Sequence, residues 1–294
     1  MEIGSDAPAP ADALVGEAIE LMRDARVAAL TGAGVSTDSG IPDYRGEGAP
    51  VRTPMTVQTF LASERARKRY WAGSHLGWRN FGAAQPNRGH LALAQLEAAG
   101  NVAGIITQNV DGLHRRAGGR HVVELHGSMD RVVCLQCGQH YARQAIAQQL
   151  EALNPSIDLG TAIRPAPDGD VEVDDVDAMV IPSCTVCGGV LKPDVVFFGE
   201  FVPVTTFQAA SSLVASADVL LVAGSSLVVN TGIRLIEQAR RRRLPIIVVN
   251  RGATRGDSRA AVKIDSGASE TLVAFADALT GTRAATDALA RNSA

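Results

Sequence analysis

Five short apolar runs, each followed by small or polar residues, restrict the fold of this chain more than any other feature. The runs are nearly all apolar and rich in β-branched residues, which is typical of strands buried on both faces of a parallel sheet. They occupy residues 27–31, 102–107, 122–125, 219–222 and 246–249.

Helical patterns lie between several of these runs. Residues 13–23, 89–99 and 232–243 carry apolar side chains at helical spacing. Strands that alternate with helices predict an α/β fold built on a doubly wound parallel sheet. In such sheets ligands bind beyond the carboxyl ends of the strands, so the residues that follow each run are the candidates for a site.

The four cysteines form two Cys-x-x-Cys pairs, with none left over. Two such pairs are the expected donor set for one tetrahedral zinc ion, Zn2+, and four thiolates would leave no open position for a reacting water. Unrelated core thiols and a redox pair are the alternatives; a redox motif needs only one pair at a helix start. The predicted ligands are Cys134, Cys137, Cys184 and Cys187.

Two stretches interrupt the alternation of strands and helices. Residues 46–86 show a helical pattern without a clear strand, and residues 129–192 hold the cysteines and a loop-like run rich in Pro, Asp and Gly. We expect both in a smaller domain with a helical module and a zinc-binding module. The larger domain would then be discontinuous, with residues 12–45, 87–128 and 193–282, followed by a tail at 283–294.

Length and charge exclude several classes of protein. The 294 residues carry a net charge of −3, which argues against binding to nucleic acid through bulk charge. No apolar run approaches the roughly 18 residues of a membrane span. The first residues contain acids and prolines and lack the basic end and apolar stretch of a signal peptide. We therefore expect a cytoplasmic protein without membrane or direct nucleic-acid partners; the composition leaves the oligomeric state open.

The first run leads into a glycine-rich loop, Thr-Gly-Ala-Gly-Val-Ser, at residues 31–36. Glycines there let the backbone approach a pyrophosphate, and a following helix start would present N–H groups to it. The loop does not match the dehydrogenase fingerprint, because Thr37 stands at the third glycine and no acidic residue stands about 20 residues further on, at the end of a second strand, to hold a ribose. A tight strand-to-helix turn is the structural alternative.

The other runs also end in groups that can bind or react. The second leads into Gln108, Asn109 and Asp111, the third into His126, the fourth into a Gly-Ser-Ser loop and the fifth into Asn250. Because the ends of parallel strands meet at one rim, these groups could surround one extended ligand. His126 could instead be a core histidine and Asp111 a turn cap. We expect His90, His114, His121 and His140 to be structural or exposed.

Taken together, these motifs resemble the sirtuins, the NAD-dependent protein-lysine deacylases. The matching stretches occur in family order between residues 32 and 250: GAGVSTDSGIPDYRG, TQNVDGLH, ELHG, both CxxC pairs, LKPDVVFFGE, GSSL and VVN. Tyr44, where many sirtuins have Phe, and the long insertion between the cysteine pairs resemble class II, the class of the fourth mitochondrial sirtuin. For a eukaryotic source, this resemblance would make the mitochondrial matrix the alternative location.

The resemblance implies a Rossmann-like domain that binds NAD, with the acyl-lysine of a protein substrate meeting NAD in the cleft beside the small domain. His126 would be the general base and Asn109 a second catalytic residue. Residues expected to contact NAD are Gly32, Ala33, Gly34, Ser36, Tyr44, Arg45, Gln108, Asn109, Asp111, Gly224, Ser225, Ser226 and Asn250. Residues expected to contact the acyl-lysine are Val196, Phe198, Gly199 and Glu200.

The implied reaction transfers the acyl group to ADP-ribose and releases nicotinamide. Protein mono-ADP-ribosyl transfer and lipoamidase activity would use the same NAD site and stay open as alternatives. No Tyr-x-x-Arg pair of the acid-acyl sirtuins is placed within residues 70–79, which favours neutral acyl chains. A zinc-knuckle module that only binds nucleotide is a further alternative, and such a module would hold NAD without releasing nicotinamide.

Overall fold

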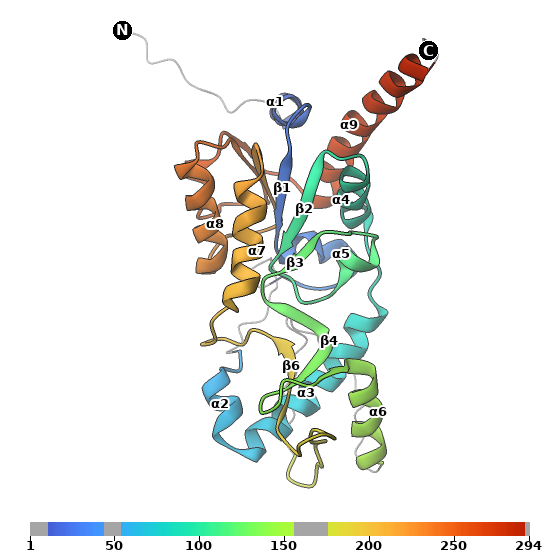
Figure 1. The fold of residues 1–294 in the computed structure, drawn as a ribbon, viewed down its shortest axis with the longest axis vertical. Helices are drawn as coiled ribbons and strands as arrows, with labels where there is room; N and C mark the ends of the chain where they lie inside the picture. Colours follow the sequence, from blue (N-terminus) through green and yellow to red (C-terminus); the bar gives the residue numbers. More distant parts are fainter. Residues whose placement is uncertain (1–10, 44–53, 156–175, 292–294) are drawn as a thin grey trace.

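The computed structural model describes residues 11–43, 54–155 and 176–291, with the side chains of all of these except 79–81 and 282–291. Two sheets organise the chain, a six-stranded sheet above and a three-stranded sheet below in Figure 1. Among the described residues, none of the helices combines the length and hydropathy that crossing a bilayer requires.

The six-stranded sheet is parallel throughout, with the order β3-β2-β1-β7-β8-β9. All five predicted strands are confirmed, and a sixth, β9, adds an edge that the sequence analysis missed. The bounds are β1 Val27–Thr31, β2 Val102–Thr107, β3 Val122–Glu124, β7 Val219–Ala223, β8 Ile246–Val249 and β9 Val262–Ile264.

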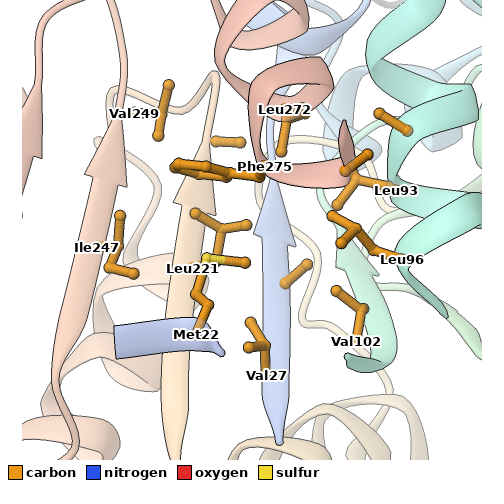
Figure 2. Packing of buried hydrophobic residues seen from close by; sticks show 14 of the residues in the cluster. Met22, Val27, Leu93, Leu96, Val102, Leu221, Ile247, Val249, Leu272 and Phe275 are labelled. Atoms are coloured by element: carbon orange, nitrogen blue, oxygen red, sulfur yellow. The ribbon is translucent and has the colours of Figure 1, made fainter. Parts of the chain in front are cut away.

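Helices cover both faces of this sheet, as the apolar strands require. Helices α1 (Ala11–Met22), α4 (Arg88–Ala98) and α9 (Ala268–Arg291) pack on one face, where Met22, Leu93 and Phe275 meet side chains from the strands (Figure 2). Helices α7 (Val204–Ala215) and α8 (Asn230–Arg241) pack on the other. The doubly wound α/β prediction is therefore confirmed. The basic run at 240–243 lies at the C-terminal end of α8, where the helix dipole favours positive charge.

The three-stranded sheet is antiparallel, with the order β5-β4-β6. Its strands are β4 (Gly127–Cys134), β5 (His140–Ala142) and β6 (Leu191–Val195). Helices α2 (Val57–Ala62), α3 (Glu64–Ala83) and α6 (Arg143–Leu153) surround it. A separate core unites these elements around Phe60, Trp71 and Leu191. This architecture fits the predicted smaller domain, whose boundaries stay a prediction.

The chain passes from the large sheet to the small one through two residues, Leu125 and His126, between β3 and β4. An ion-pair chain also joins the sheets. Arg131 on β4 binds Glu124 of β3 at 3.0 Å and Asp194 of β6 at 2.9 Å. The remaining described elements are the short helix α5 (Leu113–Arg116) and three 3₁₀ turns, Ala33–Val35, Thr37–Ser39 and Asp257–Arg259.

Candidate active site and metal centre

Two glycine loops at the carboxyl edge of the large sheet touch backbone to backbone. The Gly34 N–H donates to the Gly224 carbonyl at 2.9 Å, and the Gly32 N–H donates to that of Ala223 at 3.1 Å. The first loop continues into two 3₁₀ turns rather than the helix start that the sequence analysis considered. The loops after β1 and β7, adjacent strands of the sheet, therefore form one continuous rim.

Substitution of Gly224 by alanine is expected to destabilise the fold by about 2 kcal/mol or more. Gly224 has φ +61°, where a side chain costs roughly 1–2 kcal/mol, and an added Cβ would clash with the backbone nitrogen of Val35. Gly252→Ala is the matched control, because φ there is +74° and no atom lies within 4 Å of the added Cβ. Urea unfolding should show the larger loss for Gly224→Ala; equal losses would contradict the close contact.

Side chains from the segment that follows β2 join the first loop through a buried network. The Asn109 Nδ2 donates to the Gly32 carbonyl at 3.1 Å and to Ser36 Oγ at 3.0 Å. The Ser36 hydroxyl donates to Asp111 Oδ2 at 2.7 Å, while Asp111 Oδ1 accepts from the Leu113 N–H. Asp111 is 5% exposed, and this burial raises the pKa of its carboxyl. The network thus joins the loop after β1 to the segment after β2 at the carboxyl edge of the sheet.

His126 lies next to this network with both ring nitrogens engaged. Its Nδ1 is 2.9 Å from the backbone carbonyl oxygen of Gln108, and its Nε2 is 3.2 Å from Thr231 Oγ1. The Gln108 side chain in turn accepts from the Ser225 hydroxyl at 2.9 Å. Burial lowers the pKa of His126 below its ordinary value, so the ring is neutral at pH 7.

Two further histidines lie behind the network. His90 Nε2 is 3.4 Å from Ser36 Oγ, and His114 Nε2 is 2.9 Å from Thr31 Oγ1. Their ring centroids are 4.7 Å apart. Burial, with a smaller effect of Arg116, lowers the pKa of His90 to about 4. The sequence analysis expected structural or exposed roles for these rings; the structure makes them buried supports of the network.

The remaining candidates for NAD contact occupy the same rim. Ala33 lies in the first 3₁₀ turn, and the Ser226 carbonyl accepts from the Arg255 N–H. Asn250 follows β8, next to Gly224, whose N–H donates to the Val249 carbonyl. Tyr44 and Arg45 lie outside the described residues.

The predicted substrate segment, residues 196–200, runs beside His126. The Val196 N–H donates to the His126 carbonyl at 2.9 Å, and the Val57 N–H donates to that of Phe198 at 3.0 Å. Gly199 has φ +84°, while Phe198 is 49% exposed. Glu200 Oε2 accepts from the Phe197 N–H and from the buried Lys192 ammonium, at 2.6 and 2.9 Å. The segment is thus fixed at both ends and presents an apolar ring.

The four predicted metal ligands gather at one end of the small sheet. Their sulfur atoms all lie within 4.8 Å of one another. Each pair forms a tight turn, in which the Gly138 and Gly188 N–H groups donate to the Cys134 and Cys184 carbonyls at 3.0 and 2.8 Å. The Tyr141 hydroxyl lies 3.1 Å from Cys184 Sγ. Four converging thiols are the donor set of a closed tetrahedral zinc site.

Comparison with known proteins agrees with this geometry. A model of the Sir2 family matches residues 32–231. The NAD-dependent protein deacetylase 1 of Mycobacterium avium is 50% identical over 267 residues, covering 90% of this chain and 95% of the relative. The protein of the same name from Streptomyces coelicolor is 48% identical over 279 residues, covering 94% of this chain and 93% of the relative.

Solved structures show the same fold. A structure of Sir2 with a p53 peptide and NAD+ superposes with a TM-score of 0.71 at 31% identity, covering 91% of this chain and 98% of the other. A second structure, from a study of the mechanism and regulation of Sir2 enzymes, gives a TM-score of 0.70 at 32% identity. It covers 92% of this chain and 99% of the other. With family motifs, zinc ligands and fold in agreement over most of its length, the chain belongs to the Sir2 family, the sirtuins.

Proposed function

We propose that this protein is an NAD-dependent protein-lysine deacylase that transfers the acyl group to ADP-ribose and releases nicotinamide. One observation carries the proposal: His126, Asn109, Ser36 and Ser225, from four different strand ends, form one connected site at the carboxyl edge of the sheet. The deacetylase names of the relatives in Mycobacterium and Streptomyces support the same reaction.

The rim offers donors and acceptors suited to a dinucleotide. We assign the pyrophosphate to Gly32, Ala33, Gly34 and Ser36, the nicotinamide half to Gln108, Asn109 and Asp111, and the adenosine half to Gly224, Ser225, Ser226 and Asn250. The Gln108 Nε2 is buried without a hydrogen-bond partner among the described residues, which leaves a donor for the ligand. When bound, NAD supplies an electrophilic ribose carbon as nicotinamide leaves. Contacts of Tyr44 and Arg45 with NAD stay predictions from the sequence.

His126 is assigned as the general base that takes a proton from the ribose hydroxyl after nicotinamide has left. Its lowered pKa keeps the imidazole neutral as the pH falls through 6.5, the ordinary value. Because only the neutral ring can accept a proton, we expect the acid limb of the kcat profile to lie below pH 6.5. A profile measured from pH 5 to 9 tests this; an acid limb above that value would contradict it.

The acyl-lysine is assigned to the segment from Val196 to Glu200, with Val196 and Phe198 against the acyl chain. Gly199 and Glu200 would pair their backbone with the substrate as an added strand. A cavity of about 180 Å³ borders the segment; Val196 and Phe201 line it together with charged side chains, among them Glu124, Arg131, Lys192, Asp194 and Glu200. The substrate would be an acylated protein lysine, which agrees with the peptide present in the solved Sir2 structure.

We further assign the chain to class II, with a preference for neutral acyl chains. Tyr44 and the long stretch between the cysteine pairs support the class. The division into a discontinuous NAD domain and a small zinc domain follows the two sheets and their separate cores. The cytoplasmic location stays a prediction from the sequence.

The experiment is incubation of the purified protein with NAD and peptides that carry acetyl, longer neutral or lipoyl groups on lysine. We expect nicotinamide and O-acyl-ADP-ribose in equal amounts, and the best acyl chain identifies the substrate class. Labelled NAD distinguishes deacylation from mono-ADP-ribosyl transfer, because only the transfer would leave the label on a protein. Nicotinamide release no greater than that of His126→Ala with every peptide would refute the deacylase function.

A further inference from the structure

Thr231 is the one side chain within hydrogen-bonding distance of His126 Nε2 in the described part of the chain, at 3.2 Å. It is the second residue of α8. The sequence gives no sign of this contact, because Thr231 lies 105 positions beyond the histidine. The first turn of α8 reaches the ring because Gly232, directly after Thr231, packs closely against the Gln108 side chain: an added Cβ would lie 2.5 Å from the Gln108 Nε2.

The two contacts of the ring define its tautomer. The Gln108 carbonyl can only accept a hydrogen bond, so His126 Nδ1 must carry the proton. In the neutral ring, Nε2 then carries no proton and offers a lone pair, so the Thr231 hydroxyl must donate to it. The pair of contacts therefore leaves Nε2 as the basic atom and orients the plane of the ring.

A hydroxyl can serve both protonation states of this atom. Before a proton can reach Nε2, the Thr231 hydroxyl hydrogen turns away from the single lone pair of this atom. The ribose O–H bond then breaks as the N–H bond forms, and the Thr231 oxygen accepts from the new N–H. Hydrogen bonds from a charged donor are roughly twice as strong as neutral ones, so the contact favours the imidazolium that the reaction forms.

We propose that Thr231 is a positioning residue for the general base: with the Nδ1–H tautomer of His126 fixed by the Gln108 backbone carbonyl, the Thr231 hydroxyl holds the Nε2 side of the ring in place and stabilises the protonated ring. The proposal deepens the deacylase assignment and rests on it for the kinetic consequence. The tautomer itself is a property of the protein without substrate and can be measured independently.

The first test is ¹⁵N NMR of the histidine side chains in the ligand-free protein, with the His126 signals assigned by their loss in His126→Ala. We expect one protonated and one bare nitrogen in the wild type, with the bare signal displaced by the hydroxyl. Thr231→Val has nearly the same shape without the hydroxyl, and should move that signal; Thr231→Ser should restore the wild-type pattern. Unchanged signals in Thr231→Val would overturn the proposal.

The second test compares two steps of the reaction: the departure of nicotinamide, which precedes proton transfer to His126, and the formation of the product, which follows it. Exchange of labelled nicotinamide into NAD needs only the departure of nicotinamide, so Thr231→Val should keep it within about 2-fold. Formation of O-acyl-ADP-ribose should fall roughly 10-fold or more, with the peptide KM little changed, because a charge-assisted hydrogen bond is lost. Thr231→Ser should recover most of the rate.

Thr205→Val is the matched control, since Thr205 is the exposed second residue of α7 and the chemical change is the same. It should match the wild type in both tests. A parallel loss of exchange and product formation in Thr231→Val, or an equal loss in Thr231→Ser, would show a merely structural role. If the wild type released no nicotinamide with any peptide, the deacylase function would fail, while the NMR result would still decide the contact.

Discussion

Replacement of His126 by alanine is expected to lower steady-state deacylation by about 100- to 10,000-fold, the range that general bases contribute. The ring is the titratable group at the junction of the glycine loops and the substrate segment, and burial keeps it neutral. The β1 and β7 loops, assigned to most of the NAD contact, do not depend on it. NAD affinity measured by calorimetry should therefore stay within a few-fold of the wild type.

His121→Ala is the matched control for this experiment. The His121 side chain is 78% exposed, away from the network, and its loss should leave kcat unchanged. A His126→Ala enzyme that kept more than a tenth of the wild-type rate would show that another group accepts the proton. A large loss in His121→Ala would indicate that histidine removal harms the fold in general.

Removal of the metal is expected to have the largest effect on stability. The small sheet has few strands, and the cysteine pairs join the β4–β5 turn to the segment that leads into β6. Structural zinc contributes about 10 kcal/mol or more to the folding of small zinc modules, because the unfolded chain has no preformed site. Cys184→Ser should abolish stoichiometric zinc and lower Tm by about 10 °C or more.

Ser183→Ala is the control for that substitution, because Ser183 is the exposed neighbour of the buried ligand. It should retain one zinc per chain by elemental analysis and melt like the wild type. A strong chelator should reproduce the Cys184→Ser result, and added zinc should reverse it. A protein that kept its Tm and its near-UV circular dichroism after complete metal removal would contradict a structural role for zinc.

The large sheet was predictable because its strands are buried on both faces. Residues 27–31, 102–107 and 246–249 are apolar except for the final Thr31 and Thr107, and their bounds match β1, β2 and β8. Local composition alone determines such strands. β9 escaped prediction because it has three residues with Lys263 at its centre, and its place is set by pairing with β8.

The small sheet and part of the site were not predictable for a different reason. β6 contains Lys192, Pro193 and Asp194, which resemble a loop, and its pairing with β4 depends on contacts distant in sequence. Most residues assigned to NAD follow an apolar run, and their roles were inferred from the resemblance to the sirtuins. Thr231 follows no strand, and no local pattern indicates that it meets a ring contributed by another part of the chain.

The two-residue passage between the sheets has a mechanical consequence. His126 is part of the joint itself, and its carbonyl is bound to Val196 at the end of β6, while its ring is bound to Gln108 beside β2. A rotation of the zinc-bearing half would therefore twist the backbone that carries the imidazole. We therefore expect the position of the imidazole to depend on the angle between the two sheets, and proton transfer to His126 would be efficient only over a narrow range of that angle.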